Sequence, residues 1–335
     1  MAEPTAATEV ADGIKLIAIP TPFIVGRVNT YLFEGDQLTL LDTGPNSGTS
    51  LDELEQGLAS AGYRIEDIDR LILSHQHVDH VGLASIIKRR SGAELIAIEP
   101  LRAFLSDWSR SAERDDAVGG ALMRQAGLSQ QLLSAMSSVS RAYRAFGGSV
   151  DLDSTFSAGD SIRIGERTFE ILHKPGHSPS DTVFHSREDG LLVAADHLLE
   201  RVSSNPLVTA PLDSEADLSL RPRPLPQYLR NMAHTRDLDV SLVLPGHGEP
   251  FTDHRGVIDA RMKMHERRAA RLLASLKPNP KTAFELAEEM WGDVATTQAF
   301  LAISEVIGHM DLLVDQGSVA EQPPDSAGVI RFEAV

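Results

Sequence analysis

The feature that most constrains this chain is a cluster of polar side chains at the end of an apolar run. In LILSHQHVDH, residues 71–80, three histidines and an aspartate follow a predicted strand within six positions. Sites form at the carboxyl ends of strands in α/β sheets, because the loops gather there. In an extended turn His75 and His77 can point the same way, whereas Asp79 and His80 begin a helical turn and project differently. The spacing therefore favours two pairs of ligands that face two neighbouring metal ions.

Further compact polar residues follow later predicted strands. His177 lies in a Pro-Gly turn after RTFEILH, Asp196 ends LLVAAD, and His247 lies in a glycine-flanked turn after SLVLP. Four residues do not complete two metal sites, so these three are the candidates for the remaining ligands. The chain has no cysteine, which excludes disulfides, thiolate nucleophiles and thiolate ligands. Any metal ion must therefore be held by nitrogen and oxygen.

Composition limits the classes of protein to consider. The chain has 335 residues, 42% of them hydrophobic and 24% charged, which is ordinary for a globular protein of one large or two modest domains. No apolar run reaches the length of about 18 residues that a membrane span needs. The start, MAEPTAATEVADG, lacks the apolar core of a secretory signal. We therefore expect a cytoplasmic protein without a membrane partner.

The order of predicted elements is mixed α/β. Short strands are expected over 14–19, 29–33, 37–42, 70–74, 93–98, 161–164, 167–173, 181–186, 191–196 and 241–245. Helices are expected over 50–60, with Ser50 as N-cap, and over 81–90. In RPRPLPQYL, residues 221–229, the prolines favour an extended segment. Its Arg221 and Arg223 could meet a ligand carboxylate or phosphate, or tie the segment to acidic surface.

Two regions depart from this pattern. Residues 100–148 lack strand alternation and are predicted to form a helical insertion within a catalytic domain at 1–250. The insertion is either a lid over the metal site or simply packed on the core. Its apolar residues available for either role are Phe104, Trp108, Leu122, Met123, Leu132, Leu133, Met136, Tyr143 and Phe146. Residues 251–335 are predicted to form a small helical or winged-helix-like domain that ends in a hairpin.

The ordered set of polar residues resembles the metallo-β-lactamase superfamily of metal-dependent hydrolases. The resemblance rests on His75, His77, Asp79, His80, His177, Asp196 and His247, together with Asp42 in LLDTG. It covers residues 14–250 and implies a four-layer αβ/βα fold. The C-terminal region is similar to the winged-helix extension of the branch that includes lactamase-β-like endoribonucleases.

The resemblance also implies a role for each residue. One metal ion would be held by His75, His77 and His177, and a second by Asp79, His80 and His247. Asp196 would bridge the two ions, and Asp42 would orient the histidine loop from behind the ligands. The all-nitrogen and oxygen set suits zinc, with iron, manganese or cobalt as alternatives. The remaining histidines, His173, His185, His197, His234, His254, His265 and His309, are expected to be structural, solvated or hydrogen-bonded.

The implied chemistry is hydrolysis by a hydroxide that bridges two metal ions. Asp79 could additionally orient this nucleophile or shuttle its proton. The substrates expected are small esters, thioesters or lactones. A dedicated β-lactamase is disfavoured because Asp196 is present and cysteine is not. A specialised quorum-lactone hydrolase is disfavoured because HLLERVSS, after Asp196, lacks the tyrosine of that group.

Charge separates the remaining alternatives. The net charge of −17 argues against a broad nucleic-acid surface. From residue 279 onward only Lys281 and Arg331 are basic, against ten acidic residues. A phosphodiesterase or ribonuclease on the same metal site is therefore the runner-up, and the C-terminal region is better suited to packing, to homo-oligomer formation or to forming a wall of the substrate cleft. The insertion has six arginines and four acidic residues, so if it folds over the metal site as a lid, it would suit an anionic small molecule with an apolar acyl part. A metal-binding regulator or redox partner is the alternative from another class.

Overall fold

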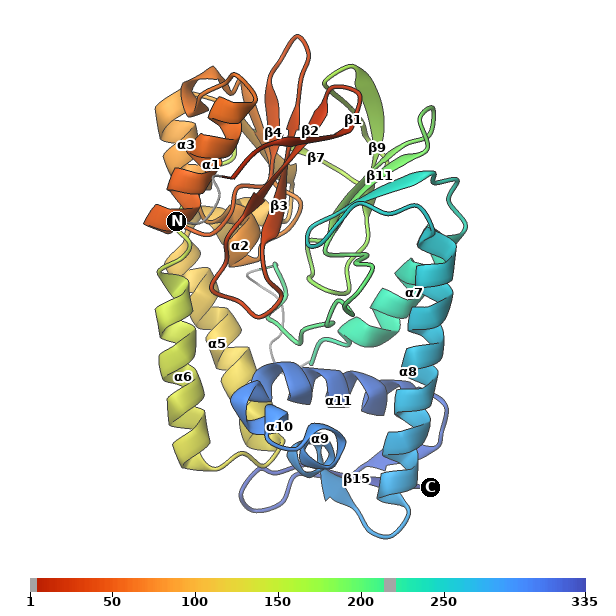
Figure 1. The fold of residues 1–335 in the computed structure, drawn as a ribbon. Coiled ribbons are helices and arrows are strands. Elements are labelled where there is room, and N and C mark those ends of the chain that lie inside the picture. The colour runs from red at the N-terminus through yellow and green to blue at the C-terminus, as the bar shows by residue number, and fades with distance from the viewer. Residues whose placement is uncertain (1–4, 214–220) are drawn as a thin grey trace.

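The computed structural model describes residues 5–213 and 221–335. Two β-sheets pack face to face, and helices cover the outer face of each (Figure 1). This arrangement is the four-layer αβ/βα fold expected from the sequence. A helical insertion and a C-terminal helical region extend from one end of the sandwich (Figure 1).

The first sheet runs in the order β1-β2-β3-β4-β5-β6-β7, and the second in the order β12-β11-β10-β9-β8. The strands of the first are Thr8–Ala11, Ile14–Ile19, Val28–Phe33, Thr39–Leu41, Arg70–Ile72, Glu94–Ile98 and Ser154–Phe156. Those of the second are, from β8 to β12, Ser161–Ile164, Arg167–His173, Thr182–Ser186, Leu191–Ala195 and Leu242–Pro245. From β4 to β7 neighbouring strands are parallel, so the carboxyl ends of these strands lie at the same edge of the sheet.

The second sheet is apolar on both faces because it separates two cores. Along β11, Leu191 and Val193 pack in the cluster between the sheets, whereas Leu192 and Ala194 pack in a cluster with α7 and α8. Successive side chains of a strand point to opposite faces, so a strand buried on both sides needs a continuous apolar run. LLVAA, residues 191–195, is such a run.

The helices of the sandwich differ from expectation at their starts. They are α1 Gly48–Ser60, a 3₁₀ helix Ile65–Asp67, α2 Val78–Val81, α3 Ala84–Ser91, α7 Pro224–Arg236 and α8 His254–Leu276. The prediction of Ser50 as the N-cap of α1 is wrong. Ser47 has the extended backbone of a cap, and its side chain accepts a hydrogen bond from the Ser50 amide. The single helix predicted over 81–90 is divided into α2 and α3.

The extended conformation predicted for residues 221–229 is also wrong from Pro224 onward. Pro224 and Pro226 occupy the first turn of α7, where a missing amide hydrogen costs nothing. Arg221 forms a two-pronged ion pair with Asp311, which is buried on α11. Of the two roles considered for Arg221 and Arg223, the structure shows the one that ties the segment to acidic residues.

The insertion consists of α4 Leu101–Ser106, α5 Trp108–Gln125 and α6 Gln130–Arg144, and α5 and α6 run down to the C-terminal helices (Figure 1). Leu122 and Met123 of α5 belong to the apolar cluster of the C-terminal region, and Met136 packs against it. Phe104 and Trp108 belong to the sandwich core instead. Of the two alternatives for the insertion, a lid over the metal site or packing on the core, these contacts correspond to packing on the core.

The C-terminal region comprises α9 Ala283–Trp291, α10 Val294–Thr297, α11 Ala299–Asp315 and a small sheet of β13 Lys281–Thr282, β14 Val319–Glu321 and β15 Arg331–Ala334. The predicted hairpin is present, as β14 pairs antiparallel with β15. The likeness to a winged-helix extension and the boundary at residue 250 stay predictions. None of the helices in residues 5–213 and 221–335 has the length and apolar content needed to cross a bilayer.

Candidate metal centre

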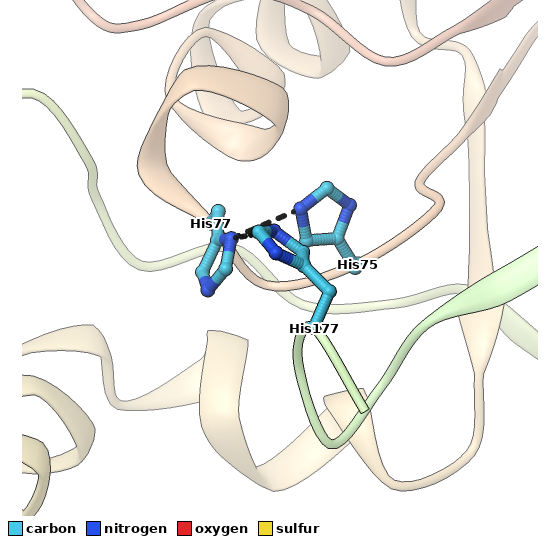
Figure 2. A group of neighbouring side chains, drawn as sticks. All are labelled: His75, His77 and His177. Atoms are coloured by element: carbon cyan, nitrogen blue, oxygen red, sulfur yellow. Dashed lines mark hydrogen bonds between the residues drawn. The ribbon is translucent and has the colours of Figure 1, made fainter. Parts of the chain in front are cut away.

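Three histidines from two loops bring ring nitrogens together (Figure 2). His75 and His77 follow β5, and His177 follows β9. His77 Nδ1 lies 3.1 Å from His75 Nε2 and 2.8 Å from His177 Nε2. Nitrogen atoms that share one tetrahedral zinc ion, each about 2.0–2.1 Å from it, are about 3.4 Å apart, so the three nitrogens lie slightly closer together than a bound zinc ion would hold them. The sequence-predicted first ligand group is therefore brought together in space.

A second group lies beside the first. Asp79 and His80 are on the short helix α2, and His247 follows β12. His247 Nε2 lies 3.4 Å from Asp79 Oδ2. Asp196, at the end of β11, stands between the groups: its Oδ2 is 3.5 Å from His177 Nε2 and 3.4 Å from His247 Nε2. One carboxylate oxygen thus faces a ligand atom of each group, which is the position expected of a bridging ligand.

The hydrogen bonds behind the histidines direct their lone pairs inward. His80 Nδ1 lies 2.8 Å from Asp42 Oδ2, His177 Nδ1 3.1 Å from the Asn205 carbonyl oxygen, and His247 Nδ1 2.8 Å from the Arg27 carbonyl oxygen. Each Nδ1–H has an acceptor, so Nε2 is the nitrogen of each ring that is left to bind a metal ion. Metal-binding histidines are characteristically oriented in this way.

Buried atoms without partners provide a test of whether a cation fits. His80 Nε2, His247 Nε2 and Asp196 Oδ1 are buried and have no hydrogen-bond partner among the described residues. Leaving a buried polar atom unsatisfied costs about 1–3 kcal/mol, and more for a charged one. Three such atoms on neighbouring candidate ligands are accounted for if metal ions complete their interactions. The residues therefore fit a divalent metal centre.

The two ligand groups differ in proton affinity. Burial, reinforced by His177, lowers the pKa of His77 to about 3. Burial also opposes protonation of His247, but Asp196 and Asp79 outweigh it and raise its pKa to about 10. For His80, Asp196 and Asp42 likewise overcome burial and raise the pKa well above its usual value. The half of the centre that contains the carboxylates is thus a strong attractor of cations.

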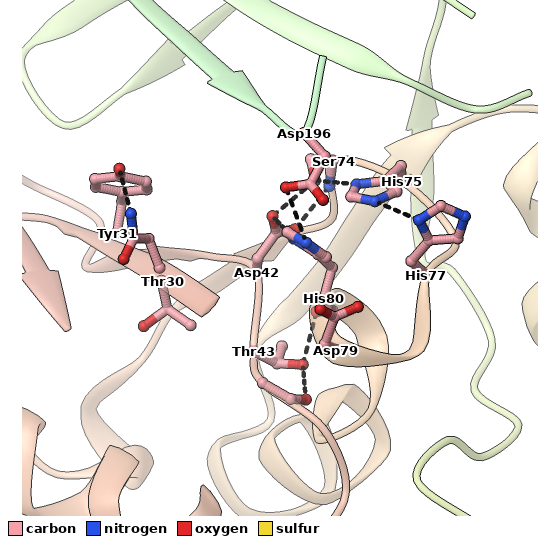
Figure 3. A network of polar contacts seen from close by, with 12 residues as sticks. Thr30, Tyr31, Asp42, Thr43, Ser74, His75, His77, Asp79, His80 and Asp196 are labelled. Carbon is pink, nitrogen blue, oxygen red and sulfur yellow. Dashed lines mark hydrogen bonds and ion pairs between the residues drawn. The ribbon is translucent and has the colours of Figure 1, made fainter. Parts of the chain in front are cut away.

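Asp42 organises the loop from behind, as Figure 3 shows. Its Oδ1 accepts the Ser74 amide at 2.8 Å, and its Oδ2 accepts both the Ser74 hydroxyl at 2.7 Å and His80 Nδ1. Because Ser74 donates its hydroxyl hydrogen to Asp42, its oxygen can accept His75 Nδ1–H, 3.0 Å away. Asp42 thereby controls one histidine of each group. It lies behind the histidine loop, in the location that the sequence resemblance implied.

Backbone strain is concentrated at this centre. Asp42 and Ala195 are the non-glycine residues with left-handed φ within the described ranges, at 60° and 43°. Such conformations cost on the order of 1–3 kcal/mol each and persist where surrounding contacts impose them. Gly246 allows its segment of the chain to approach Asp196 and His80 closely, because a Cβ there would collide with Asp196 Oδ1 and lie 2.9 Å from His80 Cε1. Only glycine fits between the two.

Several supporting residues were not found from the sequence. Asn29 on β3 donates its side-chain amide to the carbonyl oxygens of Pro245 and Gly248, and the Tyr31 hydroxyl donates to Pro245 as well. These contacts hold the loop that carries His247. No local signal reveals them, since more than two hundred residues separate the partners.

A second set of supporting contacts joins the loops of His77 and His177. The Gln76 amide donates to Ser180 Oγ at 3.0 Å, and the Ser180 hydroxyl donates to Gln76 Oε1. Ser178 donates its amide and hydroxyl to Asp181, whose pKa burial raises to about 6. The density of small polar residues in HSPSD, residues 177–181, was a signal that could have identified them.

His173 and His197 are adjacent to motif residues but bond elsewhere. His173 Nε2 lies 2.9 Å from the Pro179 carbonyl oxygen, and His197 Nε2 lies 2.8 Å from Thr235 Oγ1. These contacts agree with the structural roles expected for both histidines.

A family model described as the metallo-beta-lactamase superfamily matches residues 24–247. The chain belongs to the metallo-β-lactamase superfamily. A superfamily relative from Bacillus subtilis, named "Probable metallo-hydrolase YqjP", is 32% identical over 309 residues, covering 90% of this chain and 92% of the relative. A "Hydroxyacylglutathione hydrolase" from Rhizobium etli is 24% identical over 176 residues, about half of each chain, at 51% and 52%.

Solved structures of superfamily proteins have the same fold. A beta-lactamase domain protein from Burkholderia ambifaria superposes with a TM-score of 0.83 at 25% identity, covering 100% of this chain and 96% of that one. A metallo-beta-lactamase family protein from Thermus thermophilus gives 0.79 at 25% identity, covering 98% and 100%. Both likenesses extend over the insertion and the C-terminal region. This member of the metallo-β-lactamase superfamily is a metal-dependent hydrolase with a histidine and aspartate cluster that fits divalent ions.

Proposed function

We propose that the protein hydrolyses a small-molecule ester, thioester or lactone at a dinuclear centre, most simply of zinc. The observation that carries the proposal is the position of Asp196 between two complete groups of three ligands. The weak similarity to a protein named hydroxyacylglutathione hydrolase adds support for a thioester.

A pair of divalent ions, when bound, polarises a substrate carbonyl and lowers the pKa of water towards neutrality. The chain's own residues prepare the site for this chemistry. Asp42, with Ser74, fixes the orientation of His75 and His80, and the carbonyl oxygens of Asn205 and Arg27 fix His177 and His247. Ligands that are held in place need no rearrangement during the reaction, which lowers its barrier.

Asp79 is proposed to act on the attacking water. Burial would raise its pKa, but the neighbouring His247 and His80 lower it overall, so the carboxylate stays ionised near neutrality. An ionised carboxylate can accept a hydrogen bond from the water and orient it. Asp196 is proposed to hold the two halves of the centre at a constant separation. The substrate is proposed to be small and anionic with an apolar acyl part.

The test is metal analysis followed by a hydrolysis screen. Protein loaded with zinc and freed of excess metal should retain about two ions in this centre and hydrolyse thioesters, lactones or carboxylic esters. A chelator should abolish turnover, and zinc should restore it. Turnover of bis-p-nitrophenyl phosphate alone would replace the proposal with a phosphodiesterase, and β-lactam turnover alone would replace it with a lactamase.

A further inference from the structure

A second group of metal-binding side chain types lies apart from the candidate metal centre, between α8 and α11. It contains His265 from α8 and Glu305 and His309 from α11. Their exposed fractions are 2%, 5% and 0%, so of the two roles expected for the histidines, solvated or hydrogen-bonded, the structure shows the hydrogen-bonded one. Glu305 and His309 are four residues apart on one helix and therefore lie on the same face. Three side chains that could bind a metal ion therefore meet in the buried interface between α8 and α11.

The spacing of the nitrogen atoms suits a shared ion. His265 Nδ1 lies 3.3 Å from His309 Nε2, a distance that also allows a hydrogen bond between the two rings. Two nitrogens bound to one tetrahedral zinc ion at about 2.0–2.1 Å are about 3.4 Å apart. Glu305 Oε1 is 3.7 Å from the same His265 nitrogen. Two histidines and a glutamate are an established ligand set for zinc.

The hydrogen bonds of His309 place its proton as metal binding requires. His309 Nδ1 donates to the Glu305 carbonyl oxygen at 2.7 Å, which leaves Nε2 with a free lone pair. Burial, although opposed by Glu305, lowers the pKa of His265 to about 4, so the ring is neutral at pH 7. His265 Nε2 is buried without a hydrogen-bond partner among the described residues. Without an ion the His265 ring can donate Nδ1–H to His309 Nε2, whereas an ion at Nδ1 would place the ring proton on Nε2.

Arg268 is the group that competes with a cation. Its guanidinium pairs with Glu305 Oε1 and lies over the Trp291 ring, 5.6 Å from the ring centre. Because Oε1 is also the Glu305 oxygen nearest His265, an ion would have to displace the arginine from Oε1 or bind the second oxygen of the carboxylate. The arginine charge should nevertheless weaken binding relative to the main centre.

We propose that His265, Glu305 and His309 form an additional divalent-cation site that clamps α8 to α11. The alternative is a clasp of hydrogen bonds and one ion pair without metal. The site has a structural consequence for the main centre, because α11 also contacts the segment that orients His177: Asn205 donates its side-chain amide to the Leu301 carbonyl oxygen. An ion between α8 and α11 would stabilise the helix to which that segment is anchored.

The first experiment compares metal content between variants. Full-length protein and the variant His309→Gln are loaded with zinc, freed of excess metal and analysed by plasma mass spectrometry. The variant should contain one ion per chain fewer than the wild type. The matched control is His234→Gln, an exposed histidine on α7, which should lose none. Equal zinc content in wild type and His309→Gln, with both folded by circular dichroism, would overturn the proposal.

A direct measurement on the wild type applies even if His309→Gln does not fold. Crystals of the zinc-loaded protein, measured at the zinc absorption edge, should show an anomalous peak between His265 Nδ1 and His309 Nε2. Peaks at the main centre without one here would establish the metal-free clasp. Because neither readout depends on turnover, failure of the additional site is distinguishable from failure of the proposed hydrolysis.

Discussion

Asp196 is the residue on which the geometry of the metal centre depends most. It follows a strained residue, Ala195, and lies against Gly246, where no side chain fits. Its two oxygens face His80 on one side and His177 and His247 on the other. Backbone strain, a tight glycine contact and an unsatisfied carboxylate oxygen thus meet at one residue. This combination is characteristic of a functional site rather than of a packing position.

Replacement of Asp196 by alanine should uncouple the two halves of the centre. We expect Asp196→Ala to keep its fold, to bind fewer than two ions and to lose at least about 100-fold in kcat/KM, because even the loss of an outer partner of a metal ligand costs up to this much. Metal content and turnover are measured together. Asp189→Ala, on the turn between β10 and β11, is the control. Wild-type turnover in Asp196→Ala would exclude the bridging role.

Proton release provides a second prediction for the same residues. Asp196 and Asp79 raise the pKa of His247 to about 10, so the metal-free protein holds a proton there at pH 7. A metal ion displaces that proton, and zinc affinity should therefore rise with pH from 6 towards that pKa. Calorimetry in buffers of different ionisation enthalpy should report at least one proton released per chain. A heat independent of the buffer would show that His247 does not ligate.

At the scale of elements, helix α11 reaches the metal centre through one segment of chain. The Asn205 carbonyl oxygen accepts His177 Nδ1–H, while the Asn205 side chain donates to Leu301 on α11. Three residues on, the Val208 amide donates to Ser304 Oγ at 3.4 Å, and Val208 is fully buried in the C-terminal cluster. The C-terminal region therefore supports the wall of the site, a role that its acidic composition alone did not indicate.

Removal of this anchor should affect metal binding more than stability. We expect Asn205→Leu to weaken zinc binding by up to about 10-fold, because it keeps the carbonyl oxygen that accepts from His177 but removes the side-chain hydrogen bond that holds this carbonyl in place. Zinc affinity is measured by competition with a chelator, below the unfolding temperature. Asn279→Leu, on the exposed loop before β13, should bind zinc like the wild type. An unchanged affinity in Asn205→Leu would mean that the backbone alone fixes His177.

At the scale of the whole molecule, the insertion and the C-terminal region share one apolar core. Leu122 and Met123 of α5 pack with Ile303 of α11. Backbone hydrogen bonds reinforce the contact: the Phe284 amide donates to the Ala126 carbonyl oxygen at 3.2 Å, and the Ile330 amide to that of Gln125 at 2.8 Å. Deletion of residues 101–148 is therefore expected to unfold the C-terminal helices as well.

A single substitution tests the shared core. Leu122 is 3% exposed, and we expect Leu122→Ala to lower the free energy of unfolding by about 2–5 kcal/mol. Urea denaturation measures the loss, and metal content at room temperature should stay the same. Val139→Ala on α6, where the side chain is 43% exposed, should change stability by less than about 0.5 kcal/mol. Equal stability of the two variants would show that the insertion is independent of the C-terminal region.

The sequence by itself determined the ligand candidates and the sandwich. Strand periodicity and the histidine motifs are local patterns, and each candidate ligand follows a strand that could be recognised from its own residues. The clustering of His75, His77, Asp79, His80, His177, Asp196 and His247 agrees with that prediction. Two local predictions were wrong by a few residues. The prolines at the start of α7 predicted an extended segment although the first turn of a helix accepts proline, and the N-cap of α1 was predicted three residues too late.

Only the tertiary structure decided which distant groups support these ligands. Asn29 holds the loop of His247, Asn205 joins His177 to α11, and His265 meets His309 across two helices. No periodic pattern in the sequence predicts these contacts, because each depends on how separate elements pack against one another. The role of the insertion was decided in the same way: its apolar residues were visible in the sequence, but Leu122 and Met123 are buried with a helix almost two hundred residues further along the chain, and Phe104 and Trp108 in the sandwich core.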